Sequence, residues 1–146
     1  MLDLRTLKHL EQAIKAAQKG DRKTALGEVR QFEEKFAQEG KFANPTEWLE
    51  MMGVVAKIYQ MVGEWELAAL KFEDLCDFAE KHHPHSTEIA GDYYSLSKAR
   101  EKLGDFQGAL NAMEKSTLHL KASGQWTRYQ TSYDERISML QKLISK

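Results

Sequence analysis

Apolar residues recur every three or four positions along most of this chain, a spacing that places them on one face of an α-helix. The first stripe consists of Leu4, Leu7, Leu10, Ile14 and Ala17. Similar stripes follow to the end of the chain. Together they predict seven helices and no β-strands.

A short motif repeats three times between these stripes. It consists of a glycine, an acidic residue, three variable residues, an alanine and another small or apolar residue. The copies begin at Gly20, Gly63 and Gly104, so they are spaced by 43 and 41 residues. Glycine readily adopts the positive φ that ends a helix, and the acidic residue lies where the next helix exposes unpaired N–H groups. The motif therefore predicts a helix–turn–helix elbow, in which the alanine lets two helix backbones approach closely.

The boundaries of the helices follow from the same pattern. Asn44, Pro45 and Glu47 form a strong helix start, with a capping side chain, a proline in the first turn and a glutamate three residues after the cap. The helix pairs are expected at about residues 4–39, 45–82 and 86–123, followed by a last helix at 125–145.

A single pair of helices cannot bury its own apolar stripe, whereas stacked pairs form a continuous core. We therefore predict an all-α fold, an α-solenoid of three antiparallel helix pairs with a C-terminal capping helix. The whole chain, residues 1–146, is expected to form one domain.

Composition narrows the classes of function. The 146 residues include 21 Lys and Arg against 22 Asp and Glu, so the net charge is −1 and no general positive excess is present to hold nucleic acid. No apolar run reaches the roughly 20 residues of a membrane-spanning helix. Cys76 is the only cysteine, and residues 1–5 lack the apolar run of a secretory signal. These features predict a cytoplasmic protein with neither a nucleic-acid nor a membrane partner.

The elbows and stripes resemble the tetratricopeptide repeat (TPR) family, whose helix pairs carry aromatic, Leu-Gly, Ala and Pro residues at fixed offsets. The middle repeat matches best, with Val55-Ala56 at the Leu-Gly pair, followed by Tyr59, Gly63, Trp65, Ala68 and Phe72. The third repeat keeps Tyr93, Leu96, Gly104, Phe106 and Ala109, but has Ser97 at the glycine position and Arg100 at an aromatic position.

Two features depart from the common TPR pattern. The first repeat retains little beyond Gly20 and Ala25, and the period exceeds the family's usual value of about 34 residues. With His83-Pro84 followed by Ile89-Ala90, the longer period is similar to the extended repeats of kinesin light chain.

The resemblance implies a non-catalytic adaptor that binds a peptide or helix of a partner protein in a concave groove. In the family this groove is lined by the first helix of each pair. Mapped by offset from the elbows, the partner-binding positions of the second and third pairs are Glu50, Lys57, Gln60, Tyr94, Lys98 and Glu101. The two lysines and the tyrosine suit a peptide that offers a carboxylate and an apolar side chain. The alternative interpretation is a solvated face.

The first pair offers apolar residues at the same positions, namely Leu7, Leu10 and Ile14. Either this stripe is core or it contacts a partner or a second copy, and we favour core. In a chaperone-binding subset of the family, a ring of Lys, Arg and Asn side chains binds a C-terminal carboxylate. The corresponding positions here are Leu10, Ile14, Val54, Gly91 and Ser95, so no chaperone-tail binding of that kind is expected.

Candidate catalytic residues are few. His82, His83 and His85 form the only dense cluster of metal-ligand type, but their spacing does not converge on one ion. Cys76 lies among apolar residues, which suits a buried thiol better than a nucleophile. Phosphate-binding, zinc-protease and serine-hydrolase motifs are absent from the sequence. We expect a protein without enzymatic activity, metal or cofactor.

Charge is unevenly distributed along the chain. Residues 47–80 contain eight acidic residues against two lysines, whereas residues 1–30 have a net charge of +3. Opposite charges at two ends can join copies head to tail. A self-assembling scaffold, built through the first helix or through these charged ends, is therefore the alternative function.

Overall fold

The computed structural model describes residues 4–37, 45–82 and 87–146. Within these residues the protein has seven α-helices and no strand, so the predicted all-α class is confirmed. The helices are α1 (Leu4–Gln18), α2 (Arg22–Ala37), α3 (Pro45–Met61), α4 (Trp65–His82), α5 (Thr87–Lys102), α6 (Phe106–Ala122) and α7 (Trp126–Ile144). The chain divides into two compact units, Met1–Leu67 and Ala68–Lys146. Stacking into a solenoid and a single domain remain predictions.

The three predicted elbows are tight turns at the predicted glycines. Gly20, Gly63 and Gly104 have φ angles of 79°, 78° and 80°, and Gly124 repeats the geometry at 76° between α6 and α7. At Gly104, the amide of the next residue donates to the carbonyl of Arg100 at 2.9 Å. This hydrogen bond satisfies a carbonyl that the end of a helix would otherwise leave unpaired, and it requires a left-handed residue in the turn.

The acidic residues after the elbow glycines have two different roles. The Asp21 carboxylate accepts from the Thr24 amide at 3.2 Å, and the Asp105 carboxylate accepts from the Gly108 amide at 2.9 Å, so both cap the following helix. The hydrogen bonds from Thr24 also lower the pKa of Asp21. Glu64 instead forms an ion pair with Arg22 within the first unit. The capping prediction is therefore confirmed for the two aspartates only.

The alanines of the elbows are packing residues, as predicted. Ala25, Ala68 and Ala109 are each 0% exposed. Because an alanine side chain is short, its helix can lie close to a neighbouring backbone.

In the first unit, α1 and α2 form a hairpin against which α3 packs. The buried residues of α1 are Thr6, Leu10, Ala13 and Ala16. Leu10 is therefore core, as we favoured for the first-helix stripe, whereas Leu7 and Ile14 are only half-buried and Leu4 is 84% exposed. The buried face is turned relative to the predicted stripe, toward small residues that permit close helix contact.

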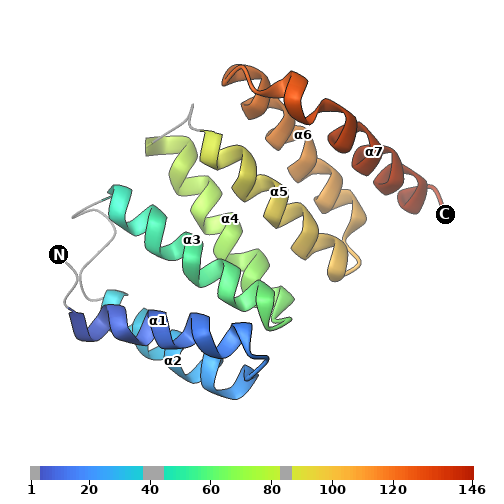
Figure 1. The fold of residues 1–146 in the computed structure, drawn as a ribbon. Coiled ribbons are helices and arrows are strands. Elements are labelled where there is room, and N and C mark those ends of the chain that lie inside the picture. The colour runs from blue at the N-terminus through green and yellow to red at the C-terminus, as the bar shows by residue number, and fades with distance from the viewer. Residues whose placement is uncertain (1–3, 38–44, 83–86) are drawn as a thin grey trace. The chain divides into compact units, whose positions relative to one another are not determined.

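In the second unit, α5 and α6 run side by side in opposite directions, and α7 packs along α6 (Figure 1). Their shared core consists of Ala90, Ala109, Leu110, Met113, Leu120, Tyr133 and Leu140. The helix predicted at residues 125–145 is α7. Its apolar stripe reaches the core through Tyr133 and Leu140, which are 5% and 0% exposed.

The start of α3 and the polarity of the helices can also be compared with the sequence predictions. α3 begins at Pro45 as predicted, while Asn44, its proposed cap, lies outside the described residues. In the described part of the chain, each helix is too short or too polar to cross a lipid bilayer.

Candidate functional site

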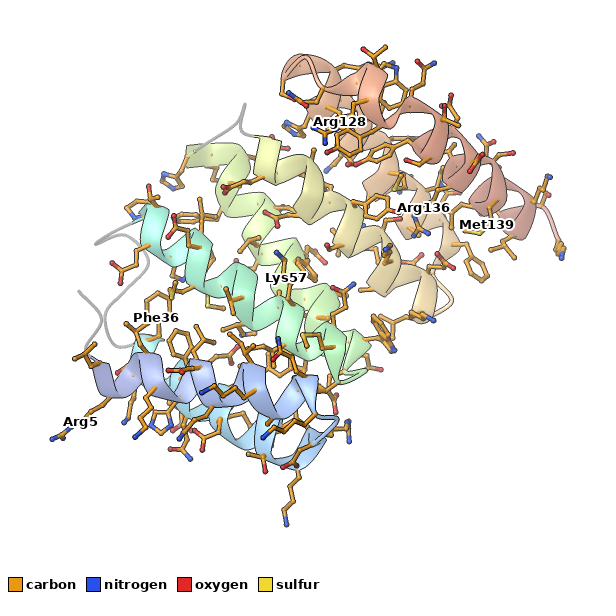
Figure 2. The ribbon with its side chains drawn as sticks, viewed as in Figure 1. Arg5, Phe36, Lys57, Arg128, Arg136 and Met139 are labelled. Carbon is orange, nitrogen blue, oxygen red and sulfur yellow. The ribbon has the colours of Figure 1, made fainter. Side chains whose placement is uncertain are left out.

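Three of the predicted partner-binding residues lie on α3, in the first unit. Glu50 and Lys57 are exposed, and Gln60 is half-buried. Lys57 extends from the helix in Figure 2. These three side chains follow one another at spacings of seven and three residues, so they share one face of α3.

The other three lie on α5, in the second unit, and are spaced so that they share a face with Gly91. Gly91, Tyr94, Lys98 and Glu101 recur at three or four residues along the helix. Gly91 and Lys98 are exposed, while Tyr94 and Glu101 are half-buried. This face of α5 contacts α7, which explains why two of the predicted residues are partly covered.

A cavity of about 400 Å³ opens where this face meets α6 and α7. Its walls come from three helices: Gly91 and Tyr94 of α5, Leu120 of α6, and Tyr129, Ser132 and Tyr133 of α7. This volume lies at the lower end of the range for small-molecule sites in proteins, about 300 to 1,000 Å³. The cavity therefore suits one large side chain better than a whole helix.

The aromatic wall of the cavity is a packed cluster of rings. Tyr94 stacks on Tyr133 with ring centroids 5.4 Å apart, and Tyr129 lies 6.3 Å from Tyr133. Trp126 meets Tyr133 edge-on at 5.9 Å. Such offset and edge-to-face contacts hold aromatic rings in fixed positions, so the wall is shaped before any ligand arrives.

Cationic side chains surround this ring cluster. The Lys98 ammonium lies 4.8 Å from the Tyr94 ring centroid, and the Arg136 guanidinium lies 5.5 Å from the same centroid. Lys121 lies 5.0 Å from the Trp126 ring, and Arg128 lies 5.7 Å from the Tyr129 ring. These cation–π distances place four positive charges around aromatic surface.

Arg136 fixes the position of α7 against α5. Its Nη1 donates to Glu101 at 2.7 Å and its Nη2 donates to the Ser97 hydroxyl at 3.0 Å, while Figure 2 shows the side chain lying between the two helices. The Ser97 hydroxyl in turn donates to the carbonyl of Ala109 at 2.8 Å. The Glu101 carboxylate is thus bound within the fold, whereas Lys98 stays exposed.

Tyr133 is held by a second polar link through the core. The Ser116 hydroxyl donates to the carbonyl of Ala90 at 2.6 Å, and Ser116 Oγ lies 2.7 Å from the Tyr133 hydroxyl. Because serine has a single hydroxyl proton, Tyr133 is the donor in the second bond. Burial raises the pKa of Tyr133, so the phenol stays neutral and able to donate.

The opposite side of α5 has a different chemistry. The Tyr93 hydroxyl donates to Glu80 of α4 at 2.9 Å, and His119 Nε2 of α6 donates to the same carboxylate oxygen at 2.6 Å. Burial disfavours the charged form of Glu80, but the hydrogen bonds from His119 and Tyr93 outweigh that penalty and lower its pKa. Burial and the Glu80 contact raise the pKa of Tyr93. This cluster ties three helices together.

The remaining residues that the sequence singled out are one cysteine and three histidines. Cys76 is buried, and burial raises the pKa of its thiol, which suits the interpretation of a packing residue. His82 packs on Phe78 with ring centroids 4.1 Å apart, while His83 and His85 lie outside the described residues. No group of three metal-ligating side chains converges among the residues that the structure describes.

Sequence reasoning missed several residues of the site. Arg136 belongs to no motif of the sequence, and Tyr129 and Tyr133 lie in the predicted last helix without a predicted role in binding. One signal was available, because the aromatic residues Trp126, Tyr129 and Tyr133 share a face with Arg136 at spacings of three and four residues. Comparison with known proteins adds no assignment, since neither a family model nor a curated protein matches the chain.

Proposed function

We propose that this chain is a non-catalytic, TPR-like module that binds a peptide or helix of a partner protein. The observation that carries the proposal is the cavity beside Tyr94, whose walls come from three helices and are aromatic on α5 and α7, with Lys98 exposed at its side. An apolar side chain gains free energy by leaving water for such walls, at roughly 25 cal/mol per Å² of apolar surface.

Charge supports the same kind of partner. Lys98, Lys121 and Arg128 lie within 4.8 to 5.7 Å of rings in the cluster, and all three are exposed. A carboxylate placed near them forms charge-assisted hydrogen bonds. The surface therefore suits a segment that carries both an apolar side chain and an acid.

The experiment is selection from a displayed library of random peptides on the purified full-length chain. Selected peptides are then measured by fluorescence polarisation against the Tyr94→Ala and Lys98→Glu proteins. We expect Lys98→Glu to weaken binding by about tenfold or more, because it replaces an attraction by a repulsion.

The matched control is Lys142→Glu, which makes the same charge change at an exposed position of α7 in the same unit. We expect it to leave the affinity within about twofold of the parent protein. Failure to select any binding peptide, or equal affinity of the selected peptides for all four proteins, would overturn the proposal.

A second candidate function, a self-assembling scaffold, is favoured by one observation on α1. Leu4 is 84% exposed, and Leu7 and Ile14 are half-buried, so an apolar edge of α1 is open to solvent. Sedimentation velocity over a wide concentration range, with Leu4→Lys as the comparison protein, tests this function. A monomer at all concentrations contradicts it.

A further inference from the structure

An exposed glycine lies at the mouth of the aromatic cavity. Gly91 lies inside α5 and lines the cavity with Tyr94 and Leu120. A Cβ added at Gly91 would meet nothing within 4 Å. Glycine inside a helix costs roughly 0.5 to 1 kcal/mol relative to alanine. Neither packing nor a positive φ requires glycine at this position, and the missing side chain leaves the cavity open beside α5.

The size and lining of the cavity define what can enter. Tyr94, Tyr129 and Tyr133 form aromatic walls, and the volume of about 400 Å³ holds one bulky side chain. Tyr133 is fixed by its hydrogen bond to Ser116, and Tyr94 by its stacking on Tyr133. Preorganised walls favour binding because the rings lose little freedom when a ligand enters.

The charges beside the cavity define what must accompany that side chain. Lys98 lies two turns along α5 from Gly91 and remains exposed, while Glu101, the acid one turn beyond Lys98, is bound by Arg136 at 2.7 Å. A carboxylate that reaches Lys98 would therefore meet a positive charge that Glu101, bound by Arg136, does not neutralise. Charge complementarity selects an acidic neighbour.

We propose that Gly91 determines specificity: it leaves open a pocket that admits one large apolar side chain of the partner segment, with an adjacent carboxylate bound by Lys98. This assignment rests on the proposed function, because it names which part of the partner the second unit recognises.

The test uses small probes that carry only the two proposed features. N-acetylphenylalanine, its uncharged amide and N-acetylalanine are titrated into the ¹⁵N-labelled full-length chain, and amide shifts are followed by NMR. We expect saturable shifts at Gly91, Leu120 and Tyr129 with N-acetylphenylalanine, weaker binding of the amide by about threefold or more, and no saturable shift with N-acetylalanine.

Gly91→Leu supplies the decisive variant. The leucine side chain fills the open space without meeting a neighbouring atom at its Cβ, so we expect a folded protein whose affinity for N-acetylphenylalanine falls at least tenfold. Gly27→Leu is the matched control, because Gly27 is an exposed glycine of α2 whose added Cβ also meets nothing within 4 Å. It should bind the probe as the parent does.

The outcomes separate this inference from the function it rests on. Library peptides that bind Gly91→Leu as tightly as the parent protein contradict the pocket and leave the binding module standing. Saturable probe binding at Gly91 without any selected peptide contradicts the binding module and retains the pocket. Probe shifts that persist in Gly91→Leu, or that equal those with N-acetylalanine, overturn the inference directly.

Discussion

Tyr93 and Tyr94 are adjacent on α5, yet they face two regions with different chemistry. The hydroxyl of Tyr93, a residue 3% exposed, donates to Glu80, which also accepts from His119. Tyr94 is half-buried, and its ring contacts Tyr133, Lys98 and Arg136. On the Tyr93 side, polar groups bind one another and hold helices together. On the Tyr94 side, aromatic rings line a cavity, and Lys98 beside them is exposed.

The largest expected effect comes from removing the residue that supports the Tyr94 side. Tyr133→Ala deletes the stack with Tyr94, the hydrogen bond to Ser116 and a ring that is 5% exposed. We expect the free energy of unfolding to fall by about 3 to 5 kcal/mol. Urea denaturation measures it, with Tyr129→Ala as the control. Tyr129 is 37% exposed, so its loss should cost less than about 1 kcal/mol.

Alanine substitutions of Gly91, within α5, and of Gly104, in the turn after α5, should change the stability of the fold in opposite directions. Gly104 has a φ of 80°, so Gly104→Ala places a Cβ in the left-handed region and should destabilise the fold by about 1 to 2 kcal/mol. Gly91→Ala should stabilise it by about 0.5 to 1 kcal/mol. Thermal unfolding of both proteins checks the contrast, and destabilisation by Gly91→Ala would show that this helix position is packed.

The hydroxyls of Tyr93 and Tyr94 should differ in what they contribute to the free energy of unfolding. Tyr93→Phe removes the donor to Glu80, and we expect a loss of about 1 kcal/mol in the free energy of unfolding. Tyr94→Phe should change this free energy by less than about 0.5 kcal/mol, because Tyr94 contacts Tyr133, Lys98 and Arg136 through its ring. Equal losses from the two substitutions would abolish the distinction between the two sides of α5.

The smallest effect concerns pH and the Tyr93 side alone. The pKa of Glu80 is lowered in the fold below its ordinary value of 4.5, so its ionised form stabilises the protein above that pH. This contribution is lost as the pH falls through the folded-state pKa. Because the Glu80 side chain is 39% exposed, we expect less than about 1 kcal/mol after solvent screening.

Glu80→Gln tests the sign of this dependence. The variant should be less stable than the parent at neutral pH, and the difference should shrink in acid. Denaturant midpoints measured across the acid range check it. Glu114→Gln, which changes an exposed carboxylate on α6, is the control. A difference that grows in acid would contradict the assigned role of Glu80.

The elbows could be predicted from the sequence because their cause is local. A helix end that needs positive φ selects glycine at that residue, so Gly20, Gly63 and Gly104 identify the turns without tertiary information. Tyr94 and Lys98 could be placed on one face of a helix for the same kind of reason, since residues four apart share a face.

The links between distant helices could not be predicted. Arg136 contacts Glu101 and Ser97 across separations of 35 and 39 residues, and no spacing rule connects such positions. The buried face of α1 was also misjudged. Ala13 and Ala16 add little hydrophobicity to a pattern, yet both are buried.

The Ser116 hydroxyl joins three helices at one oxygen, because it donates to α5 at Ala90 and accepts from α7 at Tyr133. Detachment of α7 would therefore break one of the two hydrogen bonds of the Ser116 hydroxyl. Backbone amides of α7 should accordingly exchange with deuterium in concert with those near Ser116, so that the mouth of the aromatic cavity opens through a collective fluctuation instead of by fraying from the last turn.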